Sequence, residues 1–162
     1  MKTILTPIDF SSVSDAVVTE AATLAKAVGG RVVLLTVIQP PAIMAEYAPL
    51  INDLTELTAA GEKNAERQLA RIEAQLNLDN IVTEAVQMVG APITNIVERA
   101  EEFKADYIVM GSHGHTALYD LLVGSTTHGV LQRATCPVVI VPSTKRIVVI
   151  EERDLVAKPA FA

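Results

Sequence analysis

The chain has 162 residues, of which 50% are hydrophobic and 20% are charged, and its formal net charge at pH 7 is -6. This length and apolar content suffice for one compact domain with a proper core and are too small for two ordinary domains. The acidic balance excludes a protein that binds nucleic acid through a broad basic surface, because neutralising phosphates requires a clustered excess of Lys and Arg.

The single cysteine and the N-terminal sequence bear on the cellular compartment. Cys136 has no second cysteine to pair with, which excludes an internal disulfide and fits a reducing environment, where a lone buried cysteine acts as a small hydrophobic residue. The first apolar run, TILTPI, is too short for a signal peptide or a spanning helix, and no later run reaches membrane-spanning length. We therefore expect a cytoplasmic protein without membrane insertion.

Five short runs have the composition of β-strands. The second is apolar throughout, as expected for a strand that is buried on both faces of a parallel sheet. The predicted strands are TILTPI at 3–8, RVVLLTVI at 31–38, NIVTEAVQMV at 80–89, DYIVM at 106–110 and PVVIVP at 137–142.

Helical patterns separate these strands. Apolar residues recur at helical spacing over residues 13–28, where Ser11 and Ser12 are candidate N-caps. Gly29 and Gly30 are expected to end this helix. The remaining predicted helices cover residues 56–78, 92–100 and 126–134.

Two details of these helices matter below. Gly61 weakens the start of the second helix, and residues 42–54 before it have no clear pattern. Pro92 is well placed in the first turn of the third helix, and Gly129 in the fourth is expected to mark close packing.

The order of elements is β-α-β-α-β-α-β-α-β. Such alternation requires right-handed crossovers that place helices on both faces of a parallel sheet, which is a doubly wound, three-layer α/β domain. We assign residues 1–143 to this domain and residues 144–162 to a C-terminal extension with a candidate extra strand at Arg146–Ile150.

Unusual residues follow the first and fourth strands. Pro7 and Asp9 come at the end of the first strand, and the glycine-rich sequence 110–114 ends the fourth. Ligands of open α/β sheets bind beyond the carboxyl ends of the strands, and glycines let a backbone approach an anion closely. Because the sequence 124–127, GSTT, then opens the next helix with hydroxyls and free N–H groups, we expect a phosphate to bind there.

The glycine spacing is G-x2-G-x9-G-S, which matches neither common nucleotide motif. The Walker motif requires a lysine, and none occurs between Gly111 and Thr144. The dinucleotide motif G-x-G-x-x-G belongs on the first strand-to-helix turn rather than the fourth.

Three segments, TPIDFS, DYIVMGSHG and GSTTHGVLQRATCPVVIVP, resemble the universal stress protein family over Lys2 to Pro142. The resemblance implies a five-stranded parallel sheet of order 3-2-1-4-5, like the adenine nucleotide alpha hydrolase fold, and the branch of the family that binds ATP. It implies an ATP-binding regulatory module of the stress response. A weak metal-dependent ATPase on the same fold is the alternative, and no residue is assigned a catalytic role.

The resemblance also implies which residues bind ATP. Asp9 would accept hydrogen bonds from the ribose, Val37 would offer backbone groups to adenine, and the glycine-rich positions would hold ribose and phosphates. The implied binding residues are Pro7, Ile8, Asp9, Val37, Met110, Gly111, His113, Gly114, Gly124, Ser125, Thr126 and Thr127.

The sequence raises two expectations about metal ions. Because no lysine clamps the phosphates, we expect ATP binding to depend on Mg²⁺ or Mn²⁺. The three histidines, His113, His115 and His128, allow a zinc site as an alternative to phosphate contact or exposure, but a glycine-rich turn does not fix their geometry.

Two further expectations concern partners and covering segments. The last strand would be an exposed apolar edge, and in relatives it meets its counterpart across a two-fold axis, which implies a homodimer through Val138 to Val141. The C-terminal extension, residues 144–162, either lengthens that dimer interface or docks on another protein. Residues 40–55 are either a lid over the adenine side or an ordinary loop.

Overall fold

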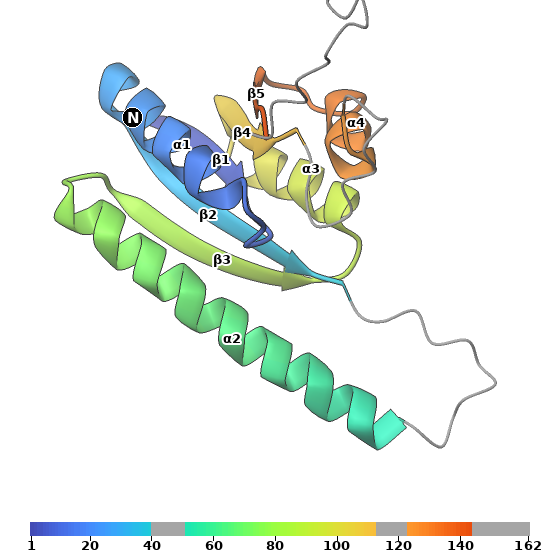
Figure 1. Ribbon diagram of the computed structural model, residues 1–162. Helices are drawn as coiled ribbons and strands as arrows, with labels where there is room; N and C mark the ends of the chain where they lie inside the picture. The colour runs from blue at the N-terminus through green and yellow to red at the C-terminus, as the bar shows by residue number, and fades with distance from the viewer. Residues whose placement is uncertain (40–50, 113–122, 144–162) are drawn as a thin grey trace, which may run out of the picture.

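The computed structural model describes residues 1–39, 51–112 and 123–143. Its centre is a five-stranded parallel sheet of order β3-β2-β1-β4-β5, which confirms the predicted fold and strand order (Figure 1). The strands are β1 (Lys2–Pro7), β2 (Gly30–Ile38), β3 (Thr83–Val89), β4 (Tyr107–Gly111) and β5 (Val138–Val141).

Helices cover both faces of the sheet and form three layers with it (Figure 1). The apolar side chains of β1, β2 and β4 alternate between two core clusters because successive residues of a strand point to opposite faces. One cluster lies under α1 (Ser14–Val28) and α2 (Ile51–Leu78), and the other lies under α3 (Pro92–Glu102) and α4 (Ser125–Leu131).

The N-terminal end of α1 differs from the prediction. Neither Ser11 nor Ser12 is the N-cap: this position is Val13, and no side chain caps the helix from there. Phe10 has a left-handed φ of 59°, so the chain turns once before the helix begins, and the N–H of Ser14 donates to the Ser11 carbonyl at 3.0 Å. At the other end, Gly29 is the left-handed C-cap as predicted, whereas Gly30 is already the first residue of β2.

Helix α2 is longer than predicted. It begins at Ile51, within the segment that shows no clear pattern, and Gly61 lies inside the helix rather than near its start. Residues 40–50, which hold most of the candidate lid, and the candidate extra strand at Arg146–Ile150 lie outside the described residues.

Other boundaries also move by one to three residues. The predicted strand 80–89 begins only at Thr83, because Asn80 has a left-handed φ of 60° and the N–H of Ile81 still bonds to the Leu76 carbonyl at the end of α2. Strand β4 continues through Gly111, which pairs with Val141. Helix α4 begins at Ser125 and ends at Leu131, one residue and three residues before the predicted limits.

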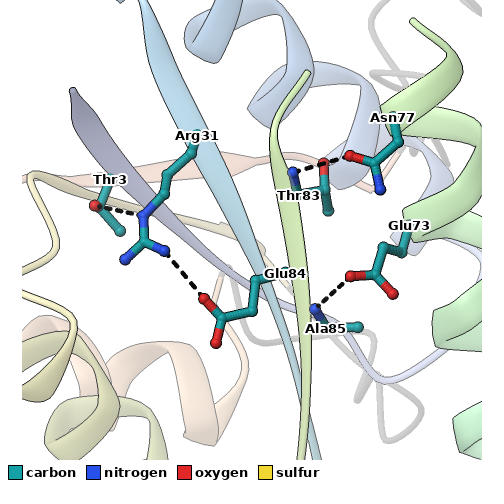
Figure 2. Close-up of polar contacts among 7 residues, drawn as sticks. All are labelled: Thr3, Arg31, Glu73, Asn77, Thr83, Glu84 and Ala85. Carbon is teal, nitrogen blue, oxygen red and sulfur yellow. Dashed lines mark hydrogen bonds and ion pairs between the residues drawn. The ribbon is translucent and has the colours of Figure 1, made fainter. Parts of the chain in front are cut away.

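Side chains of α2 cap the outer edge of β3 (Figure 2). The Asn77 Oδ1 atom accepts a hydrogen bond from the Thr83 N–H at 3.2 Å, and the Glu73 Oε1 atom accepts one from the Ala85 N–H at 3.2 Å. An edge strand with free N–H groups is a template for pairing with another chain. These two contacts occupy that edge at the start of β3.

Arg31 of β2 links three neighbouring strands at the opposite end from their carboxyl termini (Figure 2). Its guanidinium donates to the Thr3 hydroxyl at 3.2 Å and to the Glu84 carboxylate at 3.0 Å, and it lies 5.7 Å from the centre of the Phe103 ring. These contacts lie at the amino-terminal ends of the strands, away from the carboxyl edge of the sheet.

Two expectations concern the compartment and the cysteine. Over the described ranges, none of the helices combines the length and apolarity needed to cross a membrane. Cys136 is a free, half-buried cysteine just before β5. Burial raises the pKa of its thiol, and the negative charge of Asp106 adds to this rise.

Candidate functional site

A cavity of about 470 Å³ lies at the carboxyl edge of the sheet. This volume is within the range of small-molecule binding sites, about 300–1,000 Å³. The ends of β1, β2 and β4 and the starts of α1, α3 and α4 surround it, together with one stretch of α2. The position agrees with the general rule for ligands in open α/β sheets.

The cavity brings together every predicted binding residue that the structure describes. His113 and Gly114 lie outside the described residues. The others all line the cavity: Pro7, Ile8, Asp9, Val37, Met110, Gly111, Gly124, Ser125, Thr126 and Thr127. Residues more than a hundred positions apart in the chain thus share one site.

Asp9 stabilises the turn between β1 and α1. Its Oδ1 atom accepts a hydrogen bond from the Ser11 N–H at 3.0 Å and lies 3.4 Å from the Ser14 Oγ atom. The carboxylate therefore also supports the helix start, which is the structural role that helix-capping residues play. Since Asp9 is exposed and lines the cavity, its position still allows contact with a ligand.

The floor of the cavity is held by hydrogen bonds between β1 and β2. The Thr36 hydroxyl donates to the Ile8 carbonyl at 2.6 Å, and the Ile8 N–H donates to the Leu35 carbonyl at 2.9 Å. Thr36 is buried, whereas Val37, the next residue, is half-buried and lines the cavity. Both strand ends are therefore fixed relative to each other before any ligand arrives.

The start of α4 is attached to the end of β4. The Gly124 N–H donates to the Ser112 carbonyl at 2.7 Å, and the Thr127 hydroxyl donates to the Gly111 carbonyl at 2.8 Å. The first helical hydrogen bond of α4 joins the His128 N–H to the Gly124 carbonyl. The N–H groups of residues 125–127 precede this bond, so they have no acceptor within the helix.

Sequence reasoning missed the wall that α2 contributes. Gly61, Asn64, Ala65 and Gln68 of α2 also line the cavity. The two amide residues lie four positions apart and so on one face of the helix, but this spacing alone does not show that the face borders a cavity. Additional lining residues from other elements are Phe10, Val13, Ser14, Val17, Leu35, Thr36, Ile38, Gln39, Pro92 and Ile96.

The described lining of the cavity contains few charged side chains. It contains one carboxylate, Asp9, and neither lysine nor arginine. Among the residues that the structure describes, no group of three or more His, Cys, Asp or Glu side chains could hold a metal ion. His113 and His115, two of the three histidines of the zinc alternative, lie outside those residues.

Comparison with known proteins identifies the family. The model of the universal stress protein family matches residues 1–142. Universal stress protein MJ0531 of Methanocaldococcus jannaschii is 31% identical over 154 residues, which cover 90% of this chain and 84% of that protein.

Solved structures agree with this match. The universal stress protein UspA of Lactobacillus plantarum has a TM-score of 0.78 and 26% identity, over 86% of this chain and 97% of that one. A universal stress protein in complex with cAMP has a TM-score of 0.64 and 26% identity, over 86% and 96% of the two chains. By sequence and by fold, the chain belongs to the universal stress protein family.

Proposed function

We propose that this universal stress protein binds ATP, together with Mg²⁺ or Mn²⁺, in the cavity at the carboxyl edge of its sheet and acts as a nucleotide-dependent regulatory module. The observation that carries the proposal is the convergence of the predicted binding residues on one cavity of about 470 Å³. The relative that was solved in complex with cAMP supports an adenine nucleotide as the ligand.

The phosphates would bind where α4 begins. The N–H groups of Ser125, Thr126 and Thr127 have no acceptor within the helix, and all three residues line the cavity. The Thr127 hydroxyl already donates to the Gly111 carbonyl, so Thr127 would serve through its N–H group. In this proposal, Gly114 and His113 complete the phosphate contacts.

The nucleoside would occupy the other end of the cavity. The Asp9 carboxylate would accept hydrogen bonds from ribose hydroxyls, which are strong because the acceptor is charged. Pro7, Ile8 and Met110 would pack around the ribose, and the backbone of Val37 would contact the base. The half-buried apolar surface at the end of β2 suits a flat aromatic ring.

The residues present fit a metal that travels with the nucleotide. A triphosphate in a cavity without lysine or arginine among its described lining needs another source of positive charge. Phosphate oxygens and the hydroxyls of Ser125 and Thr126 are hard oxygen donors, which Mg²⁺ prefers. The metal would supply charge compensation for the phosphates, and the protein would contribute the N–H groups around them.

Charge reversal at the phosphate end tests this proposal. Thr126→Glu places a carboxylate where the phosphates would lie, and we expect calorimetry with ATP and MgCl₂ to detect at least about a tenfold loss of affinity, since like charges repel strongly at close range. Gln132→Glu is the matched control, because it adds the same charge at an exposed position beyond the cavity. Equal ATP affinity in both variants would contradict the assignment.

The same samples distinguish a binding module from an enzyme. After incubation with wild-type protein and MgCl₂, we expect chromatography to recover ATP intact. Omitting the divalent metal should weaken ATP binding, and equal affinity with and without metal would argue against its role in charge compensation.

A further inference from the structure

The cavity has a second polar wall, which two amide side chains of α2 form. Asn64 and Gln68 lie four residues apart on α2 and both line the cavity. Ala65 between them is buried, Gln68 is half-buried and Asn64 is exposed. Gln68 is therefore the deeper of the two amides and Asn64 lies nearer the solvent.

The polar residues of α2 divide into two groups by what they contact. Toward the C-terminal end of the helix, Glu73 and Asn77 accept hydrogen bonds from β3 (Figure 2). Within the described part of the chain, the side-chain amides of Asn64 and Gln68 make no hydrogen bond. The first group stabilises the fold, whereas the amides at the cavity are available for a ligand.

The apolar lining beside this wall suits a base rather than a phosphate. Ile38 at the end of β2 is half-buried and lines the cavity with Ala65, and by strand alternation it lies on the same face of the sheet as Leu34, in the cluster under α1 and α2. Ile38 and Ala65 provide apolar contact for a ring, while an amide at the ring edge provides one acceptor and two donors.

We propose that Gln68 is the residue that reads the base, through a two-point contact between its side-chain amide and the edge of adenine. This inference rests on the proposed nucleotide site and specifies the base that the site selects. Both exposed edges of adenine present an amino donor beside a ring-nitrogen acceptor, which is the complement of an amide. The major-groove edge of guanine instead presents two acceptors, which leave the amide oxygen without a partner there. Asn64 borders the same wall nearer the solvent and contributes less.

The experiment compares ATP with purine ribonucleoside triphosphate, which lacks the 6-amino group and is otherwise identical. Wild-type protein should bind ATP about tenfold more tightly, the effect of one good two-point contact to a base. Gln68→Leu keeps the size of the side chain and removes its hydrogen-bonding groups, so the preference should fall severalfold, and any remainder would come from the backbone of Val37. Gln75→Leu is the matched control, because Gln75 is an exposed residue of α2 outside the cavity lining.

Circular dichroism and thermal unfolding establish that both variants are folded. The comparison of ATP with the analogue in wild-type protein does not depend on the folding of any variant. If wild type binds ATP and the analogue equally well, the assignment of Gln68 as the residue that recognises adenine is wrong, whereas the proposed nucleotide site is still supported. If wild type prefers ATP and Gln68→Leu keeps the full preference, another residue reads the base and the inference is also wrong. If wild type binds neither ligand, the proposed function fails and the inference fails with it.

Discussion

The Thr127 hydroxyl donates a 2.8 Å hydrogen bond to the carbonyl of Gly111, which joins the first turn of α4 to the last residue of β4. Thr127 is buried, with 3% of its surface exposed, and both residues line the cavity. The bond holds the N–H groups at the start of α4 in place beside the strand end. A preformed site of this kind loses less conformational entropy when a ligand binds.

Removing this hydroxyl should affect stability and binding together. Thr127→Val leaves the half-buried Gly111 carbonyl without this partner, and we expect a loss of about 1 kcal/mol in the free energy of unfolding, measured with urea. ATP affinity should fall as well, since the start of α4 is no longer fixed. Thr127→Ser keeps the hydroxyl and serves as the control. Wild-type stability and affinity in Thr127→Val would show that the bond has no such role.

Asp9 allows the helix-supporting role to be separated from the binding role. Asn retains an oxygen that can accept from the Ser11 N–H, so Asp9→Asn should leave the unfolding free energy nearly unchanged. The uncharged amide is a weaker acceptor for ribose hydroxyls, so ATP affinity should fall by about tenfold. Asp9→Ala should lose both, with a cost of about 1 kcal/mol in stability. Unchanged ATP affinity in Asp9→Asn would exclude the carboxylate from the site.

Two helical glycines should respond oppositely to alanine. A Cβ atom at Gly129 would overlap the Ile93 side chain of α3, so Gly129→Ala should destabilise the fold by about 1–3 kcal/mol. A Cβ atom at Gly61 would meet only open space, so Gly61→Ala should stabilise α2 by about 0.5–1 kcal/mol. Thermal unfolding of the two variants measures both effects. Equal shifts of the melting temperature in one direction would contradict this account.

The start of β1 makes stability depend on pH. The Lys2 ammonium donates to Asp106 at 2.7 Å, and with the Thr3 N–H at 2.8 Å it lowers the pKa of the Asp106 carboxyl below its ordinary value. A lowered pKa in the folded state stabilises the protein above the unfolded-state pKa, and this stabilisation is lost as the pH falls through the folded-state value. The difference in unfolding free energy between wild type and Asp106→Asn should therefore be present at pH 7 and disappear well below about pH 4. Urea unfolding from pH 7 to pH 2.5 measures it, and a difference that is constant over this range would contradict the role of the charge. Asp79→Asn, at an exposed turn position, is the control.

The two edges of the sheet differ in a way that supports the proposed homodimer. Side chains of α2 cap the edge of β3, as described above. In β5, the Pro137 and Val141 carbonyls accept from β4, so by alternation the backbone groups of Val138 and Ile140 face away from the sheet. No hydrogen bond from another described residue covers them.

Ile140→Pro tests the dimer because it removes one outward N–H group and leaves the pairing with β4 intact. We expect light scattering at micromolar concentration to report a dimer for wild type and a monomer for Ile140→Pro. Ile140→Val, which keeps the N–H group, should remain dimeric. A monomeric wild type would contradict the proposed assembly.

The sequence predicted the elements well where the pattern has a local cause. The apolar run at 31–38 and Pro92 at the start of α3 each have a short-range physical reason, and both predictions are confirmed. Ser11 and Ser12 failed as N-caps because the chain makes a left-handed turn at Phe10 and the N-cap position falls on Val13, and residue preferences alone do not reveal such a turn.

The candidate site was predicted in part for a related reason. Glycine spacing and the upstream Pro7 and Asp9 mark the strand ends, and topology brings those ends together. Asn64 and Gln68 were missed because nothing in the local sequence distinguishes an amide that lines a cavity from one that faces solvent. Only the packing of α2 against β2 and β3 makes that distinction.

Calorimetric titration of the nucleotide-free chain with ATP in excess MgCl₂ tests the central claim most directly. The account predicts saturable binding of one ATP per chain, weakened by Thr126→Glu and not by Gln132→Glu. A titration with no binding heat, joined by unchanged melting temperatures in saturating ATP, ADP, AMP and cAMP, would contradict it.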